Sequence, residues 1–272
     1  MNAPLELLVD GIACSEPWAT DRGLLYGDGL YETMRAAAGR VRFEEQHVAR
    51  LADGCRRLAI HVDLPRLWSQ ARAAAQRHGE ATLRLQVTRG SAVARGYTPA
   101  GTEVPRTLLA VYAPPAASEL PAHRRALTLQ ARLGENPLLA GLKHCNRLEQ
   151  VLARMELAAR GGAFEGPLAS SSGRLVSGTM SNVYLELDGE LVTPTLDLCG
   201  VAGVLRAVVL RTARQAGIAL REAALPIDVL GRCSALAFSN ARMGLVSVHE
   251  LDGRALGESA ALRTLAAQVA AL

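Results

Sequence analysis

The spacing of apolar residues in the first half of the chain predicts both helices and strands. Apolar positions recur at helical intervals in segment 43–60, which includes Val48, Leu51 and Cys55. In segment 81–90 every second residue is apolar instead, which is typical of a half-buried strand. Two further apolar segments predict strands at 107–114 and 126–133.

The second half of the chain has the same mixed character. The apolar pattern there predicts a strand-like region at 181–194, a helix at 204–216 ended by Gly217, a strand at 234–240 and an amphipathic helix at 259–272. Helices and strands follow one another without a regular βαβ order, so the expected fold class is α+β. A segment rich in Pro and Ala at 113–123 is expected to connect two lobes.

A further helix is predicted directly after residue 143. Asn146, with Glu149 three residues later, has the spacing of a capping box, in which Asn146 would be the N-cap. One face of this helix would carry Leu148, Val151, Leu152, Met155 and Ala159.

Composition narrows the classes of partner. The chain has 272 residues, of which 49% are hydrophobic and only 4% aromatic, and a net charge of +4. So few aromatic side chains do not favour a platform for single-stranded nucleic acid. No apolar run reaches the roughly 18 residues of a membrane span, and the first residues lack the features of a signal peptide. Five widely spaced cysteines favour reduced thiols in the cytoplasm.

One position stands out among the basic residues. Lys and Arg together number 30, and Lys143 is the only lysine. Arginine stays protonated in proteins, whereas a lysine amine can lose its proton and act as a nucleophile or a base. An amine, and not a guanidinium, is required to form a Schiff base with an aldehyde cofactor. The alternative is a lysine kept by chance in an arginine-rich chain.

The residues around Lys143 carry a resemblance to a known family. The run "LAGLKHCNRLEQVLAR" is very similar to the segment around the Schiff-base lysine of fold-type-IV pyridoxal-phosphate enzymes, the branched-chain and D-amino-acid aminotransferase-like superfamily. The resemblance covers essentially the whole chain. It implies a two-lobed α+β fold with pyridoxal 5′-phosphate between the lobes. The smaller lobe would be residues 1–115, and the larger, 116–272, would carry Lys143 and the phosphate cradle.

The same resemblance implies the cofactor contacts. Arg50, in "HVARL", would bind the phosphate, for which a planar guanidinium is well suited. "GVAGVLR" and "FSNARMG" resemble two other phosphate-binding segments of the family. They implicate the helix start at Val204 and Leu205, and the turn at Asn240 and Ala241.

Two further motifs imply substrate contacts. "DRGLLYGDGLYETMR" resembles the family's N-terminal signature, in which Tyr31 would line the pocket. "TRGSAVARGYTP" resembles the loop that receives a substrate carboxylate, which implicates Arg95 and Tyr97, with Arg89 as a weaker candidate.

Position 177 departs from the family pattern. Members usually carry a glutamate five residues before the asparagine equivalent to Asn182, and that carboxylate keeps the pyridine nitrogen protonated. This chain has Ser177 there. A hydroxyl can hydrogen-bond to the ring nitrogen but cannot supply a charge. The serine therefore disfavours transamination relative to an elimination that forms an aromatic product.

Within the family, the run "HCNRLEQ" is most similar to 4-amino-4-deoxychorismate lyases. The implied reaction converts 4-amino-4-deoxychorismate to 4-aminobenzoate and pyruvate in folate biosynthesis, with Lys143 as the base. The alternatives are an aminotransferase of D- or branched-chain amino acids, or a cofactor-binding protein that has lost activity. The resemblance also implies a homodimer. The composition and the apolar runs favour neither a nucleic-acid nor a membrane partner, and the six histidines are not grouped at metal-ligand spacing.

Overall fold

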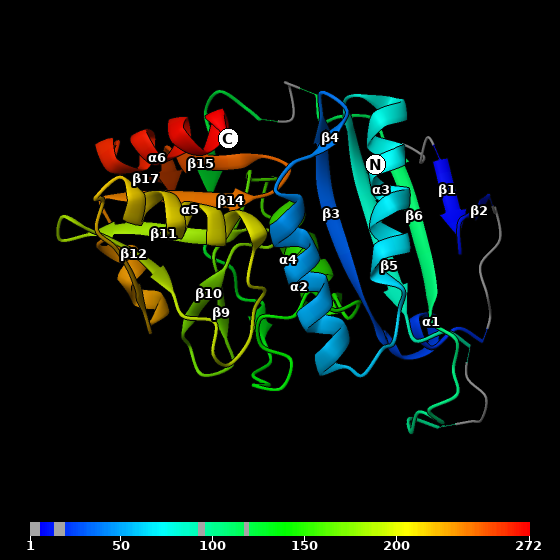
Figure 1. Ribbon diagram of the computed structural model, residues 1–272. Coiled ribbons are helices and arrows are strands. Elements are labelled where there is room, and N and C mark those ends of the chain that lie inside the picture. The colour runs from blue at the N-terminus through cyan, green and yellow to red at the C-terminus, as the bar shows by residue number, and fades with distance from the viewer. Residues whose placement is uncertain (1–5, 14–19, 92–95, 117–119) are drawn as a thin grey trace. The chain divides into compact units, whose positions relative to one another are not determined.

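A computed structural model describes residues 6–13, 20–91, 96–116 and 120–272 (Figure 1). The chain forms two compact units. The first comprises residues 1–116 together with 142–146, and the second comprises 117–141 and 147–272. Packing therefore groups Lys143 with the first unit. The lobes predicted from the sequence, 1–115 and 116–272, remain a prediction.

The first unit is built on an antiparallel sheet with the strand order β2-β1-β6-β5-β3-β4. Its strands are β1 (Glu6–Val9), β2 (Ile12–Ala13), β3 (Gly29–Ala37), β4 (Arg40–Val41), β5 (Ala81–Thr88) and β6 (Arg106–Tyr112). The predicted strands at 81–90 and 107–114 are thus confirmed. Leu83, Leu85 and Val87 are fully buried, as their alternation predicts.

The helices in the described part of this unit are α1 (Arg22–Tyr26), α2 (Glu44–Arg57) and α3 (Leu64–His78). Helices α2 and α3 cover the sheet (Figure 1), and bury Leu51 and Trp68 respectively. The helix predicted at 43–60 is confirmed. Asp63 caps α3 by accepting a hydrogen bond from the backbone N–H of Arg66.

In its described residues, the second unit contains three sheets. Five strands form the largest, in the order β13-β12-β11-β14-β15. The other two have the orders β10-β9-β8 and β17-β16-β7. The strands are β7 (Arg125–Ala126), β8 (Arg132–Leu133), β9 (Leu168–Ser170), β10 (Leu175–Ser177), β11 (Asn182–Leu187), β12 (Glu190–Pro194), β13 (Leu220–Ala223), β14 (Ala235–Asn240), β15 (Gly244–Val248), β16 (Glu250–Leu251) and β17 (Arg254–Ala255).

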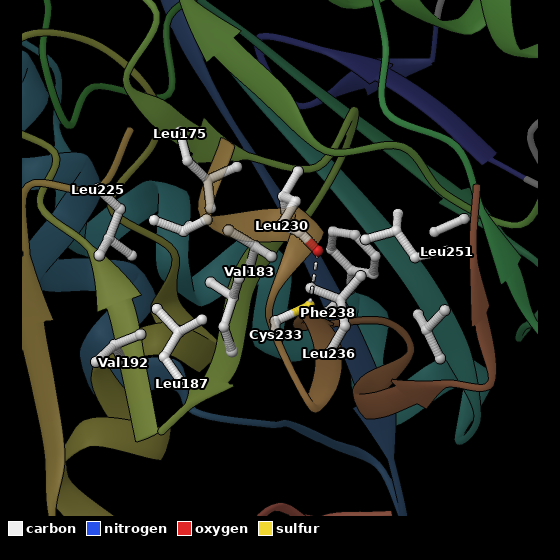
Figure 2. Close-up of a cluster of buried hydrophobic side chains, with 14 residues drawn as sticks. Leu175, Val183, Leu187, Val192, Leu225, Leu230, Cys233, Leu236, Phe238 and Leu251 are labelled. Carbon is white, nitrogen blue, oxygen red and sulfur yellow. Dashed lines mark hydrogen bonds between the residues drawn. The ribbon is translucent and has the colours of Figure 1, made fainter. Parts of the chain in front are cut away.

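The helices of this unit are α4 (Leu148–Ala159), α5 (Val204–Gln215), the short 3₁₀ helix η2 (Ile227–Gly231) and α6 (Ala260–Ala271). Helices α5 and α6 lie side by side on one face of the five-stranded sheet (Figure 1). A cluster of buried apolar side chains in this unit includes Leu236, Phe238 and Val183 (Figure 2). The predicted strand at 234–240 and the predicted helices at 204–216 and 259–272 are confirmed.

Segment 181–194 forms a hairpin rather than one strand. Strands β11 and β12 are joined at Asp188 and Gly189, which have φ angles of 52° and 84°. Positive φ at both central residues is the requirement of a type I′ turn, and Asp-Gly is among the sequences that meet it.

The prediction of a strand at 126–133 is wrong for most of that segment. Only the two-residue strands β7 and β8 lie near its ends. Between them the backbone N–H groups of Gln130 and Ala131 donate to the Glu156 carboxylate. The Arg132 guanidinium binds the carbonyl oxygens of residues 129–131. The segment still pairs in part with residues 165–167, since the N–H groups of Leu127 and Leu129 donate to the carbonyls of Glu165 and Pro167. The side-chain contacts begin where this pairing ends, so no continuous strand forms.

The predicted start of α4 is also wrong. The helix begins at Leu148 with Arg147 as its N-cap, and no side chain caps it. The Asn146 side chain donates to the carbonyl of Gly27, and Glu149 accepts from the N–H of Gly134. The face of α4 that carries Leu148, Val151, Leu152 and Met155 is exposed, whereas Ala153 and Leu157 are buried.

In the described part of the chain, no helix combines the length and the apolar character needed to cross a membrane.

The buried cluster of Figure 2 gives a test of the fold. Leu236 is fully buried on β14, so Leu236→Ala should lower the free energy of unfolding by about 2–5 kcal/mol through lost contacts and a cavity. Urea unfolding followed by circular dichroism measures this loss. Leu272→Ala, at the exposed C-terminal residue, should change it by less than about 0.5 kcal/mol. Equal effects of the two substitutions would contradict the assignment of the core.

Candidate active site

Lys143 is fixed by backbone pairing to strand β3. Residue His144 forms an antiparallel bridge with Leu30. The N–H of Tyr31 donates to the Lys143 carbonyl at 3.0 Å, and the N–H of Cys145 donates to the Gly29 carbonyl at 2.9 Å. The lysine thus lies beside strand β3 and not on a free loop, which restricts where its amine can reach.

The side chain of Tyr31 lies next to the amine. Lys143 Nζ is 4.4 Å from the centroid of the Tyr31 ring, and the guanidinium carbon of Arg84 is also 4.4 Å from it. Cations are attracted to the face of an aromatic ring at such distances. The structure therefore brings Tyr31 and Lys143 together.

A buried ion pair lies in the same unit. Glu32 follows Tyr31 on β3, and its carboxylate is 1% exposed. It accepts from Arg50 Nε at 2.8 Å, from a terminal nitrogen of Arg50, and from His47 Nδ1 at 2.6 Å. Burial alone would raise the pKa of Glu32. The positive charge of Arg50 and the hydrogen bonds from His47 and Arg50 instead lower this pKa to about 2.

His47 is buried on the sheet side of α2 and has a pKa below its ordinary value of 6.5. Burial is the main cause; the Glu32 carboxylate opposes it, while the charges of Arg50 and Lys143 add to the lowering. The imidazole is therefore neutral at neutral pH, with Nδ1–H donating to Glu32. Because the Lys143 charge acts on His47, the amine and this buried cluster share one electrostatic environment.

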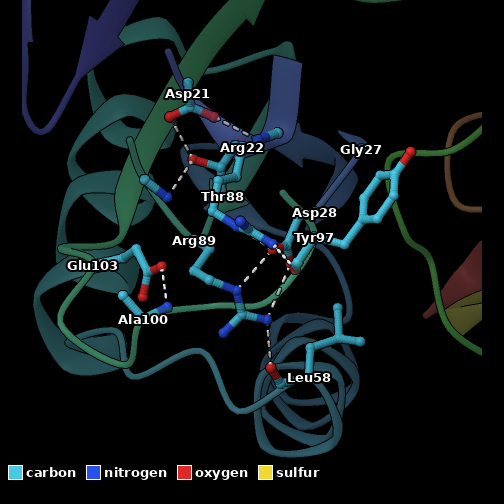
Figure 3. A network of polar contacts seen from close by, with 12 residues as sticks. Asp21, Arg22, Gly27, Asp28, Leu58, Thr88, Arg89, Tyr97, Ala100 and Glu103 are labelled. Carbon is cyan, nitrogen blue, oxygen red and sulfur yellow. Dashed lines mark hydrogen bonds and ion pairs between the residues drawn. The ribbon is translucent and has the colours of Figure 1, made fainter. Parts of the chain in front are cut away.

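Two of the residues predicted to bind substrate, Tyr97 and Arg89, belong to a second polar network in the first unit (Figure 3). Arg95 is outside the described residues. Arg22, only 3% exposed, donates to the carbonyls of Gly96 at 3.3 Å and Tyr97 at 2.6 Å. The Tyr97 ring is exposed and meets the ring of Tyr26 edge to face, with 5.3 Å between centroids.

Arg89 belongs to this network through Asp28. Its guanidinium binds both carboxylate oxygens of Asp28 and the carbonyl oxygens of Leu58 and Ala59. Burial acts to raise the pKa of Asp28, but hydrogen bonds from Arg89 and Arg22 outweigh it and lower that pKa. Arg89 therefore has a structural task, joining β5 to the end of α2.

Ser177 lies at the end of β10 in the second unit. It is 8% exposed, and its hydroxyl donates to the carbonyl of Gly178 at 2.8 Å. A tight turn follows, closed by the N–H of Gly178 donating to the Ser181 carbonyl at 2.8 Å. Strand β11 then begins at Asn182.

Asn182 connects this turn to the start of helix α5. Its side-chain amide donates to the Val201 carbonyl at 2.9 Å. The N-cap of the helix is Gly203, where a Cβ atom would lie 2.0 Å from Asn182 Oδ1, so a larger residue would require the Asn182 side chain to move. No side chain caps the first turn, which contains the buried Val204 and Leu205. Helix N-termini of this kind favour anions through their N–H groups and dipole.

Asn240 connects the same turn to strand β14. Its side-chain oxygen accepts from the N–H groups of Arg242 and Met243, and its amide donates to the Met180 carbonyl at 3.3 Å. The second unit thus brings together the predicted cofactor contacts at Ser177, at Val204 and Leu205, and at Asn240 and Ala241. Their roles stay predictions.

Glu32 and His47 were not assigned roles from the sequence, although signals were present. Glu32 is in phase with Leu30, Met34 and Ala36, all buried on β3, and a glutamate in an apolar alternation indicates a paired buried charge. His47 is four residues before Leu51, on the buried face of α2. Glu165, described below, had no such signal.

Comparison with known proteins identifies the family. A model of the family described as amino-transferase class IV matches residues 29–251. The chain belongs to this family, whose members depend on pyridoxal phosphate. The predicted fold-type-IV resemblance is confirmed.

The similar proteins include lyases and aminotransferases. Aminodeoxychorismate lyase of Vibrio harveyi is 30% identical over 244 residues, which cover 88% of this chain and 89% of that protein. A putative branched-chain-amino-acid aminotransferase of Methanocaldococcus jannaschii is 32% identical over 244 residues, covering 87% and 83%. The crystal structure of 4-amino-4-deoxychorismate lyase from Pseudomonas aeruginosa matches with a TM-score of 0.90 and 40% identity, covering 96% of this chain and 97% of that one.

The lowered pKa of Glu32 predicts a pH-dependent contribution to stability. The carboxyl has an ordinary pKa of 4.5 and a folded-state pKa of about 2. Its contribution of about 3 kcal/mol is therefore complete above pH 4.5 and lost as pH falls toward 2. Glu32→Gln should be less stable than the parent near neutral pH, and the difference should shrink below pH 4.5. Urea unfolding at a series of pH values measures it.

Glu45→Gln provides the control, because Glu45 is exposed on the same helix as His47 and Arg50. That substitution should cost less than about 1 kcal/mol at any pH. A stability loss in Glu32→Gln that does not vary with pH would contradict the ion-pair interpretation.

Proposed function

We propose that this protein is a pyridoxal-phosphate-dependent lyase that converts 4-amino-4-deoxychorismate to 4-aminobenzoate and pyruvate, a step of folate biosynthesis. The observation that carries the choice of lyase is the similarity, along nearly the whole chain, to the enzyme of that name from Pseudomonas aeruginosa. The run "HCNRLEQ" after Lys143 agrees with it.

The residues present fit the cofactor. Lys143 offers an amine for its aldehyde, and Arg50 offers a guanidinium for its phosphate. In the second unit, the start of α5 at Val204 and Leu205, which no side chain caps, and the turn at Asn240 and Ala241 would offer backbone N–H groups to a phosphate. Ser177 would contact the ring nitrogen. When bound, pyridoxal phosphate supplies an aldehyde that bonds to amines and a ring that accepts an electron pair.

Lys143 acts in the proposed reaction as a general base. Its Nζ takes the proton from the substrate carbon that bears the amine. The C–O bond to the enolpyruvyl group breaks, and one proton is added to that group as it leaves as pyruvate. Atoms and electrons therefore balance without an oxidant, and the formation of an aromatic ring favours the products. Glu32 holds two nitrogens of Arg50 and so fixes the direction of the guanidinium.

Substrate carboxylates would be bound by Arg95 and Tyr97, with Tyr31 lining the site beside Lys143. Arg22 holds the backbone on the C-terminal side of Arg95 through two carbonyls. Arg89 is not included in this proposed site, because Asp28 and the carbonyls of Leu58 and Ala59 engage its guanidinium.

An aminotransferase is the second candidate, favoured by the similarity to the Methanocaldococcus jannaschii protein. Transamination depends more strongly on a protonated pyridine than an elimination that forms an aromatic product. Ser177 brings no charge to the ring nitrogen, which supports the lyase. The homodimer implied by the family and the cytoplasmic location favoured by the cysteines are part of this proposal.

Lys143→Arg tests the proposed role of the lysine. Arginine keeps the charge but cannot bond to an aldehyde or take a proton. The rate of pyruvate formation from 4-amino-4-deoxychorismate, coupled to lactate dehydrogenase, should fall by at least about 100-fold.

The reciprocal exchange Arg154→Lys, at an exposed position of α4, should leave the rate unchanged and serves as the matched control. An active Lys143→Arg protein would contradict the role of the lysine. A parent protein that forms no pyruvate but transfers its amino group to a keto acid would establish the aminotransferase instead.

Ser177→Glu tests the interpretation of the serine. A carboxylate at position 177 should help to keep the ring nitrogen protonated and therefore raise the aminotransferase side activity severalfold. An assay of D-alanine or a branched-chain amino acid with a keto-acid acceptor measures it. A side activity lower than that of the parent would contradict this account, and Ser177→Thr, which keeps the hydroxyl, is the control.

A further inference from the structure

Glu165 is a fully buried carboxylate in the second unit that the proposed mechanism does not use. Its backbone is held in place by pairing with the chain at β7. Residue 165 forms a parallel bridge with Ala126, and its carbonyl accepts from the N–H of Leu127 at 3.3 Å. Strand β9 begins three residues later at Leu168. The position of the side chain is therefore set by the sheet.

Both carboxylate oxygens accept hydrogen bonds. Oε1 accepts from the N–H of Gly166 at 3.0 Å, the N–H of Thr179 at 2.8 Å and the Thr179 hydroxyl. Oε2 accepts from the Ser181 hydroxyl at 2.7 Å and the N–H of Met180 at 3.4 Å. Among the described residues, no basic side chain forms an ion pair with Glu165. Its charge is balanced by neutral donors, most of them in residues 179–181.

The turn lies directly on this carboxylate. A Cβ atom on Gly178 would be 2.9 Å from Glu165 Cδ and 2.3 Å from Ser181 Oγ, so a larger residue there would displace these two side chains. The carbonyl of the same Gly178 accepts from the Ser177 hydroxyl. Only Gly178 therefore separates Ser177 from residues 179–181, which donate hydrogen bonds to Glu165.

The turn also contacts the two segments predicted to bind phosphate. Asn240 donates to the carbonyl of Met180, which is part of the turn. Asn182 follows the turn directly and donates to the carbonyl of Val201, two residues before the N-cap of α5. A change in the position of residues 178–181 would therefore be transmitted to the start of α5 and to the end of β14.

We propose that Glu165 is a positioning residue of the cofactor site and compensates in part for the carboxylate missing at position 177. It holds the turn that orients Ser177 and Asn182, and it places a fixed negative charge at that turn. A buried negative charge that no cation neutralises favours the protonated form of a nearby base. This inference rests on the proposed function, because it assumes that pyridoxal phosphate binds at Ser177.

Glu165→Gln separates charge from shape. Glutamine has a similar size, can accept from Gly166 and Thr179, and can donate to the Ser181 hydroxyl, but it carries no charge. The dissociation constant of pyridoxal phosphate, measured by absorbance titration, should rise about tenfold. The pH midpoint of the bound cofactor's absorbance change should move to lower pH, an effect that a purely structural role would not produce.

The matched control is Glu156→Gln. Glu156 also holds a loop of the second unit through backbone N–H groups, those of Gln130 and Ala131. Both variants should lose similar thermal stability without cofactor, whereas only Glu165→Gln should change the affinity and the pH midpoint. A Glu165→Gln protein with parental values for both, or a Glu156→Gln protein with the same changes, would overturn the inference.

Thr179→Val covers the case in which Glu165→Gln does not fold. It removes one hydroxyl donor from the carboxylate and keeps the backbone N–H, and it should weaken cofactor binding severalfold. Parental affinity in that variant would overturn the inference. A parent protein that does not bind pyridoxal phosphate overturns the proposed function and this inference together, whereas parental binding with unchanged variants overturns the inference alone.

Discussion

A carboxylate buried away from water must be surrounded by donors, and each unit of this chain contains a site organised by that requirement. Glu32 is balanced by a guanidinium and an imidazole, which lower its pKa to about 2. Glu165 is balanced by backbone N–H groups and hydroxyls. The first arrangement fixes the direction of Arg50, and the second fixes the shape of the turn after Ser177. In both cases a charge that is costly to bury makes the neighbouring backbone and side chains adopt one geometry.

The two arrangements differ in what they do to the surrounding electric field. Arg50 neutralises Glu32, so little net charge remains in that part of the first unit apart from Lys143 and Arg84. Neutral donors stabilise Glu165 but leave its charge in place. Under the proposed function, Ser177 brings no charge to the cofactor site, whereas the charge of Glu165 remains at the turn that follows. In the proposed reaction, the formation of an aromatic product would favour the elimination even in this weaker field.

Most elements with a clear apolar period could be predicted, including α2, α5, α6 and strands β5 and β14. The errors arose where side chains replaced backbone partners. Glu156 and Arg132 bind the backbone at residues 129–131, where a strand was expected. Asn146 and Glu149 bind Gly27 and Gly134 rather than each other. The family motif identified Lys143, but Glu165 binds Thr179 and Ser181, which are 14 and 16 residues away in the sequence. Such contacts form only when the sheets have folded, and they leave no periodic pattern in the sequence from which they could be predicted.

The single lysine also has a practical consequence for handling the protein. A protease that cleaves only after lysine has one possible site in this chain, the bond between Lys143 and His144. That bond lies in the segment that pairs with β3, where Lys143 and Cys145 share hydrogen bonds with Tyr31 and Gly29. A protease needs its substrate in an extended, unpaired form. Cleavage into two fragments therefore reports, at one defined bond, how often this segment detaches from the strand.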